Sequence, residues 1–417
     1  MLTSSEPYWW EAAEPPETPD EPASPECDAV VVGAGYAGLS AALELARAGR
    51  SVQLFDRQRP GEGASSRNGG IASGNLRLSF GDLTRTKGLD QAKAMYREGA
   101  EARNDLVRFI EEERIDCDFR LTGRFTGAAT PAHYDAQRRE ADLLNGYLDI
   151  GARCVPRDAQ HAEIASELFH GGVVRPDVGG LHPAKFHAGF MSVATAAGVR
   201  VFGNTAVLAI RRDGGGFEAL TDRGAVRARD IVVTTNGYTD GCDPWLRRRL
   251  VPVASRMIAT EPLDTAVVRA LIPNGRMLGT SRRLHNYFRP SPDGRRILFG
   301  GRDRTGGRDP ERAAARLRNE LVTIFPQLSD VRITHAWAGN VAFNLDHLPR
   351  LFLHDGIHYA AGFCGSGVVW ARWLGSKAAQ RILGDGRCRS AFEGRPPWAI
   401  PFYAGKPWFL PAARSAL

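Results

Sequence analysis

Three glycines and one aspartate have the residue types and spacing needed to bind a nucleotide. Gly33, Gly35 and Gly38 follow the short apolar run 28–32 and precede an apolar-periodic segment. In a strand–turn–helix unit, glycines allow a tight turn close to a pyrophosphate, which faces the unpaired N–H groups of the helix. Asp56 ends the next apolar run, where a carboxylate can accept hydrogen bonds from ribose hydroxyls. The pattern predicts a β-α-β unit that holds a dinucleotide.

The segment after Asp56 distinguishes between the possible dinucleotides. Residues 61–71 (GEGASSRNGGI) form a long loop of small residues with few side chains. Such a loop lets backbone lie against a flat, extended cofactor, which an NAD dehydrogenase does not need so soon after the acidic residue. The loop therefore favours FAD. A second glycine-rich turn at 364–367 opens a predicted helix over 368–383, and this arrangement favours an anion.

The remaining pattern predicts helices and strands in alternating blocks. Residues 86–150 are charged and periodic, which is typical of helices. Short apolar runs predict strands at 199–202, 206–210, 217–220, 230–234 and 358–363. Turns are expected at 213–216 and at 291–294.

Composition limits the class of protein. The chain has 417 residues, a net charge of +7 carried mostly by scattered arginine, and no basic block with interleaved aromatic residues. Nucleic-acid binding is therefore not expected. Six widely spaced cysteines without a CxxC pair argue against a metal site and favour a reducing, cytoplasmic location. No apolar run is long enough to span a membrane. The proline-rich, acidic segment 1–26 reads as an extended arm that docks through Tyr8, Trp9 and Trp10.

Seven segments in order carry a resemblance to a known family: 27–49, 64–70, 114–125, 179–183, 287–301, 336–351 and 362–369. The chain resembles the FAD-dependent amine and amino-acid oxidases, which include D-amino-acid oxidase, glycine oxidase and sarcosine oxidase. Within this family it is most similar to the gamma-glutamylputrescine oxidoreductases. The resemblance covers about residues 27–385.

The resemblance implies which residues hold FAD. It assigns the ADP half to Gly33, Gly35, Gly38 and Asp56, and the phosphates and flavin edge to Arg67, Asn68, Gly69 and Gly70. It assigns nucleotide contacts to Val207, Thr235 and Asn236, and the pyrimidine end of the flavin to Gly365, Ser366, Gly367 and Val368.

Four departures from the family pattern bear on the chemistry. Gly339 stands where sarcosine oxidase-like members tether the flavin through cysteine, so the FAD is expected to be non-covalent. Val341 replaces the arginine that clamps a substrate carboxylate, and Ser366 replaces a histidine. Leu298 stands near the position of a lysine implicated in oxygen activation.

The resemblance implies oxidation of the C–N bond of a small primary or secondary amine, by hydride transfer to flavin. The expected substrate is gamma-glutamylputrescine-like or an N-substituted amino acid, and the electron acceptor is oxygen or another molecule. Tyr287, Arg302 and Trp337 are the main substrate-side candidates, with Arg289, Asn340 and Phe343 beside them. Two alternatives stay open: an enzyme acting on an amine carried by tRNA, and a dehydrogenase subunit that passes electrons to a partner. The oligomeric state is left open.

The expected fold is α/β with an α+β second domain. A Rossmann-type FAD-binding domain is assigned to residues 27–85, 151–235 and 331–390. An inserted substrate domain, with a mostly antiparallel sheet, is assigned to 86–150 and 236–330, and a C-terminal tail to 391–417.

Overall fold

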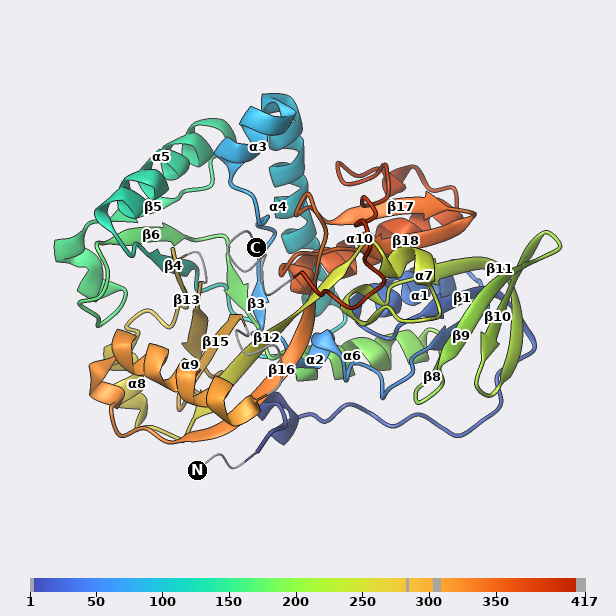
Figure 1. Ribbon diagram of the computed structural model, residues 1–417, viewed down its shortest axis with the longest axis horizontal. Coiled ribbons are helices and arrows are strands. Elements are labelled where there is room, and N and C mark those ends of the chain that lie inside the picture. The colour runs from blue at the N-terminus through green and yellow to red at the C-terminus, as the bar shows by residue number, and fades with distance from the viewer. Residues whose placement is uncertain (1–3, 283–284, 303–308, 410–417) are drawn as a thin grey trace.

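The computed structural model describes residues 4–282, 285–302 and 309–409. Two eight-stranded sheets lie side by side, with helices packed around both of them (Figure 1). The last eight residues of the expected C-terminal tail lie outside the described part. Among the described residues, no helix is long and apolar enough to cross a membrane.

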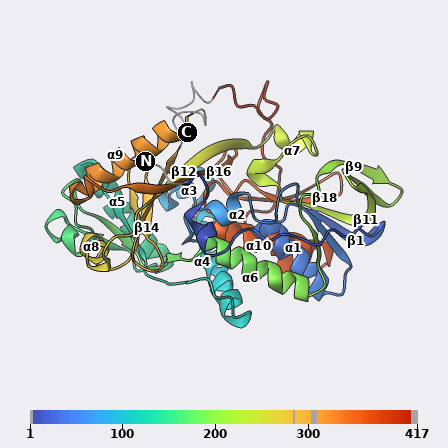
Figure 2. The same ribbon diagram turned by 90° about the horizontal axis from the view of Figure 1, so that it is seen from below.

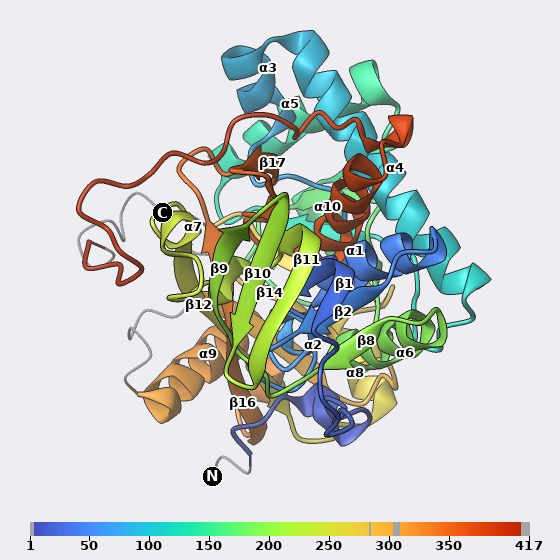
Figure 3. The same ribbon diagram turned by 90° about the vertical axis from the view of Figure 1, so that its right-hand side faces the viewer.

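The first sheet has parallel strands at its centre. Its order is β17-β18-β11-β1-β2-β8; in addition, β10 pairs antiparallel with β11, and β9 pairs antiparallel with β10 (Figure 3). Strands β18, β11, β1, β2 and β8 run parallel to their neighbours within this set. The strands are β1 (Glu26–Val32), β2 (Val52–Phe55), β8 (Arg200–Phe202), β9 (Val207–Asp213), β10 (Gly216–Thr221), β11 (Gly224–Val233), β17 (Arg350–His354) and β18 (Ile357–Ala361).

The second sheet is mostly antiparallel, in the order β16-β12-β15-β14-β13-β4-β6-β5. One pair, β13 with β4, is parallel. The strands are β4 (Arg124–Gly127), β5 (Arg153–Val155), β6 (Gly172–Arg175), β12 (Val251–Thr260), β13 (Met277–Thr280), β14 (Tyr287–Pro290), β15 (Ile297–Arg302) and β16 (Ile333–Phe343). A separate two-stranded pair joins β3 (Ile71–Ala72) to β7 (Gly179–Gly180).

Ten α-helices occur among the described residues. They are α1 (Tyr36–Arg47), α2 (Ala64–Arg67), α3 (Phe80–Lys87), α4 (Leu89–Glu112), α5 (Pro131–Leu148), α6 (Pro183–Ala196), α7 (Pro244–Arg247), α8 (Thr265–Leu271), α9 (Pro310–Ile324) and α10 (Gly367–Ile382). Seen from below, α1, α6 and α10 lie together against the first sheet (Figure 2).

The mixed α/β fold with a parallel, nucleotide-binding type of sheet and a mostly antiparallel second sheet confirms the expected fold class. However, the division of the strands between the two sheets does not coincide with the predicted domain boundaries. Strands β5, β6 and β16 lie inside ranges assigned to the FAD-binding domain, yet they pair in the second sheet. Helix α4, assigned to the substrate domain, packs its apolar face into the core around α1 and α10. The division into domains stays a prediction.

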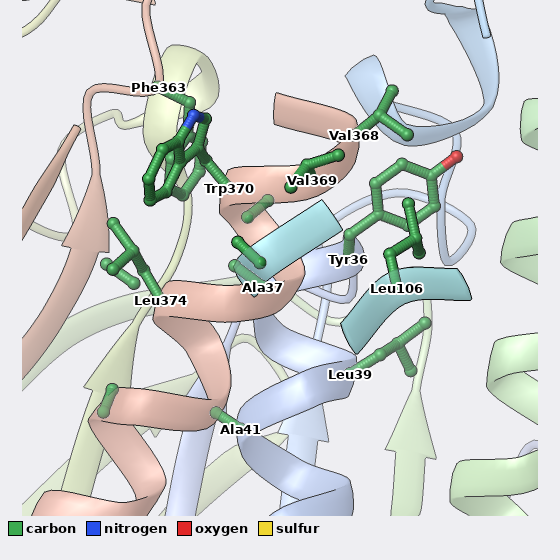
Figure 4. Close-up of a cluster of buried hydrophobic side chains, with 14 of the residues drawn as sticks. Tyr36, Ala37, Leu39, Ala41, Leu106, Phe363, Val368, Val369, Trp370 and Leu374 are labelled. Atoms are coloured by element: carbon green, nitrogen blue, oxygen red, sulfur yellow. The ribbon is translucent and has the colours of Figure 1, made fainter. Parts of the chain in front are cut away.

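Close packing of α1 against β1 and α10 fixes the start of α1. A Cβ at Gly38 would lie 1.8 Å from the carbonyl oxygen of Gly33, so any side chain there would force the turn apart. Ala37 of α1 lies against α10, where a Cβ at Gly375 would be 2.2 Å from the Ala37 carbonyl oxygen, whereas Leu39 points toward Leu106 of α4 (Figure 4). The sequence places small residues where backbone meets backbone, and this packing holds the glycine-rich turn at the end of β1.

The N-terminal arm connects the two sheets along one side of the molecule (Figure 1). Ser4 exchanges backbone hydrogen bonds with Thr334 and Ala336 of β16. Farther along the arm, the Thr18 hydroxyl accepts a hydrogen bond from the N–H of Gly203, next to β8. Between these points, Trp9 is fully buried and Trp10 nearly so, within the one-turn helix η1 (Tyr8–Glu11). The arm is therefore an ordered part of the structure.

Candidate active site

A first cavity lies at the carboxyl ends of the parallel strands β1, β2 and β11. Its walls include most of the residues expected at the ADP half of a cofactor: Gly33, Gly35, Asp56, Val207, Thr235 and Asn236. Gly38 does not line the cavity, because it packs against the turn from behind. Ligands of open parallel sheets bind at this end of the strands, where the order of the strands reverses.

Asp56 holds the glycine-rich turn in place. Its Oδ2 accepts a hydrogen bond from the N–H of Ala34 at 2.8 Å, and its Oδ1 accepts one from Gln58 at 3.0 Å. Burial raises the pKa of this carboxyl to about 6, although both hydrogen bonds oppose the shift. The position fits the expected contact with ribose hydroxyls, which stays a prediction.

The turn after β11 forms the opposite wall. Asn236 has a left-handed backbone (φ 47°) and its Oδ1 accepts a hydrogen bond from the N–H of Gly362 at 2.8 Å. This bond ties the turn to the segment that leads from β18 into α10. Thr235 is fixed by a hydroxyl contact of 2.7 Å with Thr239.

The start of α10 lies where the first cavity meets a second one. Gly365 and Val368 line both cavities, Gly367 lines the first and Ser366 the second. No side chain caps the first turn of α10, so its positive end is available to an anionic group at this junction. The two cavities share further walls, including Ala64, Asn68, Asn340 and Val341, and therefore adjoin.

Cys364 also lines both cavities, as a packed thiol. It is buried, and its Sγ donates to the carbonyl of Gly362 at 3.1 Å. Burial raises the pKa of this thiol to about 12. The thiolate that would react with an electrophile is therefore scarce near neutral pH.

The loop around α2 separates the cavities, and three tryptophans support it. The indole N–H of Trp9 donates to the carbonyl of Asn68 at 2.8 Å, and that of Trp337 donates to the carbonyl of Arg67 at 2.8 Å. Trp10 donates to the hydroxyl of Ser66 at 2.9 Å. Because Trp9 and Trp10 come from the arm, the arm helps to shape the wall between the cavities. The sequence predicted that the arm docks; its contact with this loop was missed.

Residues 67–70 of this loop take different positions. Asn68 lines both cavities, Arg67 and Gly69 line only the second, and Gly70 lines neither. The Arg67 Nε donates to the carbonyl of Glu62 at 2.6 Å, and its guanidinium lies 4.5 Å from the ring centre of Trp10. Of the four residues expected at the phosphates and flavin edge, only Asn68 faces the first cavity.

The second cavity lies between the α2 loop and the second sheet. Tyr287, Arg302, Asn340 and Phe343, four of the six residues predicted on the substrate side, line it; their role there stays a prediction. The hydroxyl of Tyr287 contacts the Oγ of Ser255 at 3.0 Å, and the Arg302 guanidinium lies 4.9 Å from the ring centre of Phe343.

Two expected substrate-side residues lie elsewhere. Trp337 is buried in an apolar cluster with Trp9 and Met257, and its N–H is used by the α2 loop. Arg289 is buried and donates to the carbonyls of Gly70 and Leu181 at 2.9 and 2.8 Å. Trp337 shares a face of β16 with Gly339 and Val341 but lies beyond the end of the cavity. The alternation of side chains along a strand predicts which face a residue occupies, but not whether the cavity extends that far along the strand.

The second cavity is also lined by residues that the sequence did not single out, chiefly Arg77, Arg124, Arg282 and His285. No described lining residue is an aspartate or a glutamate. Burial, with the charges of Arg124, Arg77 and Arg302, lowers the pKa of His285 to about 3. The cavity therefore disfavours a cation. These residues come from three separate segments without a motif, so spacing gave no signal for them.

Comparison with known proteins identifies the family. A family model for FAD-dependent oxidoreductases (DAO) matches residues 28–381. The chain belongs to the DAO family of FAD-dependent oxidoreductases. FAD is its cofactor, and the enzyme acts on amines or amino acids. Gamma-glutamylputrescine oxidoreductase of Escherichia coli (strain K12) is 31% identical over 380 residues, which cover 90% of this chain and 88% of that protein.

Other relatives agree with this assignment. OrdL of Haemophilus influenzae is 33% identical over 377 residues, covering 88% of this chain and 85% of that protein. The crystal structure of glycine oxidase from Geobacillus kaustophilus matches with a TM-score of 0.75 at 19% identity, covering 92% of this chain and 99% of that one.

The residues of the first cavity and the junction fit FAD. A glycine-lined turn with a carboxylate behind it suits the ADP half. The open first turn of α10 and the side chain of Asn68 lie at the junction, where the flavin would meet the second cavity. The cofactor's reactive ring would then border the arginine-lined space.

Proposed function

We propose that this enzyme oxidises the C–N bond of a small primary or secondary amine that enters the second cavity. The substrate is gamma-glutamylputrescine-like or an N-substituted amino acid. The similarity to gamma-glutamylputrescine oxidoreductase supports this choice, as does the junction between an FAD-type cavity and a separate side-chain-lined cavity. The cytoplasmic location and the discontinuous FAD domain stay predictions.

The observation that carries the proposal is the positive charge of the second cavity. Bound FAD supplies a hydride acceptor, and the carbon beside a nitrogen releases hydride readily only when that nitrogen is neutral. Burial, together with the charges of Arg124, Arg77 and Arg302, disfavours a cation here and lowers the pKa of His285. The same field lowers the pKa of a bound ammonium group and favours the free amine.

Other residues of this cavity orient the substrate and limit water. Phe343 and Met257 supply apolar walls, while the Tyr287 hydroxyl, held by Ser255, offers a hydrogen-bonding group. Loss of hydride leaves a C=N bond, which water hydrolyses to a carbonyl compound and an amine or ammonia. The chain's own contribution is placement and electrostatics.

The thiols near the junction support non-covalent binding of FAD. Gly339 offers none, and the thiol of Cys364 is buried, hydrogen-bonded and raised in pKa. The electron acceptor is oxygen or another molecule. Leu298 is fully buried in an apolar cluster, so the lysine implicated in oxygen activation has no counterpart at this position, which supports a slow reaction with oxygen.

The test is an anaerobic titration of the purified yellow holoenzyme, followed by visible absorbance. We expect amines or N-substituted amino acids to bleach the flavin, and air to restore the colour slowly. Denaturation should release the flavin into solution if it is non-covalent. A flavin that no amine bleaches would contradict the proposed function. Fast return of the colour in air would contradict only the expected slow reaction with oxygen.

A further inference from the structure

The second cavity contains more positive charge than a simple amine needs. Five described arginines line it: Arg67, Arg77, Arg124, Arg282 and Arg302. Arg67 donates a hydrogen bond to the Glu62 carbonyl and lies over the ring of Trp10. The other lining residues carry apolar groups, hydroxyls, amides, the His285 imidazole and the Cys364 thiol, and none of those described carries a carboxylate. This excess of charge points to the part of the substrate that does not react.

The Arg124 side chain packs closely against a neighbouring strand in the cavity wall. Arg124 begins β4, and its guanidinium lies against Gly279 of the neighbouring strand β13, where a Cβ would be 2.3 Å from Nη2. A larger residue at 279 would have to displace the end of this side chain. Its Nε is shut off from solvent and has no hydrogen-bond partner among the described residues. Burial lowers the pKa of Arg124 to about 10, with a smaller contribution from Arg175.

Arg77 provides a second cation nearer the exterior. It lies on the segment after β3, lines the cavity and is more exposed than Arg124. It likewise has no ion-pair partner among the residues that the structure describes. The charges of both arginines reach His285, which shows that they act on the same space.

A partly buried guanidinium without an opposite charge beside it is costly, and an anionic ligand offsets that cost. Arginine binds carboxylate and phosphate oxygens through paired N–H groups, which makes it suited to such a ligand. Desolvated charges are strongly stabilised only when they meet an opposite charge with good geometry. Arg124 is therefore placed for a ligand rather than for the fold.

We propose that the enzyme selects amines whose non-reacting end carries two anionic groups, one bound by Arg124 inside the cavity and one by Arg77 near its mouth. This inference rests on the proposed function, because it places the substrate in the second cavity. It makes Arg124 and Arg77 residues that determine specificity. The ligand chemistry is that of a dicarboxylate or of a phosphate-bearing amine.

The first test measures binding without turnover. Calorimetry on the holoenzyme compares glutarate, glutaramide and inorganic phosphate. We expect glutarate to bind and glutaramide not to bind. Arg124→Gln should lower the affinity for glutarate by about tenfold or more, because a charge-assisted hydrogen bond is lost. Arg138→Gln is the control, because Arg138 pairs with Asp135 on α5, outside the cavity. Tighter binding of phosphate than of glutarate would assign the site to phosphate-bearing amines.

The second test uses anaerobic flavin reduction by a series that shares one N-methyl group. We expect N-methylglutamate to reduce the flavin faster than N-methylglutamine, and N-methylputrescine to be slowest. Arg124→Gln and Arg77→Gln should raise KM for the dicarboxylate more than they lower kcat. Equal binding of glutarate to Arg124→Gln and Arg138→Gln, or a preference for N-methylputrescine, would overturn the inference. Failure of every amine, with glutarate binding intact, would instead contradict the proposed function.

Discussion

The two cavities are built in different ways, although they meet at the start of α10. Backbone and small residues shape the first cavity, around a turn that Asp56 fixes through the Ala34 N–H. Side chains from distant segments shape the second, with arginines as its charged groups. A cavity built from backbone tolerates few substitutions and keeps its ligand. A cavity built from side chains can change its ligand without changing the fold.

The largest expected effect breaks the backbone-built cavity. Gly38→Leu places a side chain where even a Cβ would be 1.8 Å from the Gly33 carbonyl. We expect little folded, FAD-containing protein, because the β1–α1 turn cannot close. The measurement is the ratio of flavin to protein absorbance after purification, together with the Tm.

Gly146→Ala is the matched control, since Gly146 lies in α5 and a Cβ at this position would meet nothing within 4 Å. This variant should keep its FAD and lose no stability, because alanine favours a helix over glycine. Equal flavin content in Gly38→Leu and Gly146→Ala would contradict the account of the turn.

The arm should give the next largest effect, because it supports the wall that both cavities share. Trp9→Ala removes a fully buried ring and should lower the free energy of unfolding by about 3–5 kcal/mol. Trp9→Phe keeps most of the apolar contact but loses the hydrogen bond to Asn68, at a cost of about 1 kcal/mol. Chemical denaturation measures both, with the exposed Trp398→Phe as control.

The arm also offers a comparison between the cavities. If Trp9→Phe displaces the α2 loop, both FAD affinity and the rate of flavin reduction should fall. Unchanged FAD affinity and rate in Trp9→Phe would show that the arm only adds stability.

A smaller expected effect is the pH dependence of FAD affinity, which involves only the first cavity. Burial raises the pKa of Asp56 to about 6, and FAD binding is expected to favour the ionised form that accepts hydrogen bonds from ribose. Affinity should therefore be constant above about pH 7 and weaken as pH falls through about 6. Asp56→Asn should bind FAD more weakly at neutral pH and lose this pH dependence. Fluorescence quenching of added FAD measures both proteins; parallel pH curves would contradict the role of Asp56.

The same difference explains what the sequence could predict. Gly33, Gly35 and Asp56 act through local backbone geometry, which leaves a spacing pattern. The nucleotide-binding β-α-β unit was predicted from that pattern, and the second domain from the family resemblance. Arg124 reaches the second cavity only because β4 pairs with β13 across more than a hundred residues, and no local pattern records this pairing. Trp337 and Arg289 carried the right chemistry but pack behind the cavity, because their partners are backbone carbonyls of distant loops.

The most direct test of the central claim is a single anaerobic turnover with product analysis. Holoenzyme is mixed with one equivalent of an amine that bleaches the flavin, and the products are quantified by mass spectrometry. The account predicts one carbonyl compound and one amine or ammonia for each flavin reduced. Flavin reduction without cleavage of a C–N bond would contradict it.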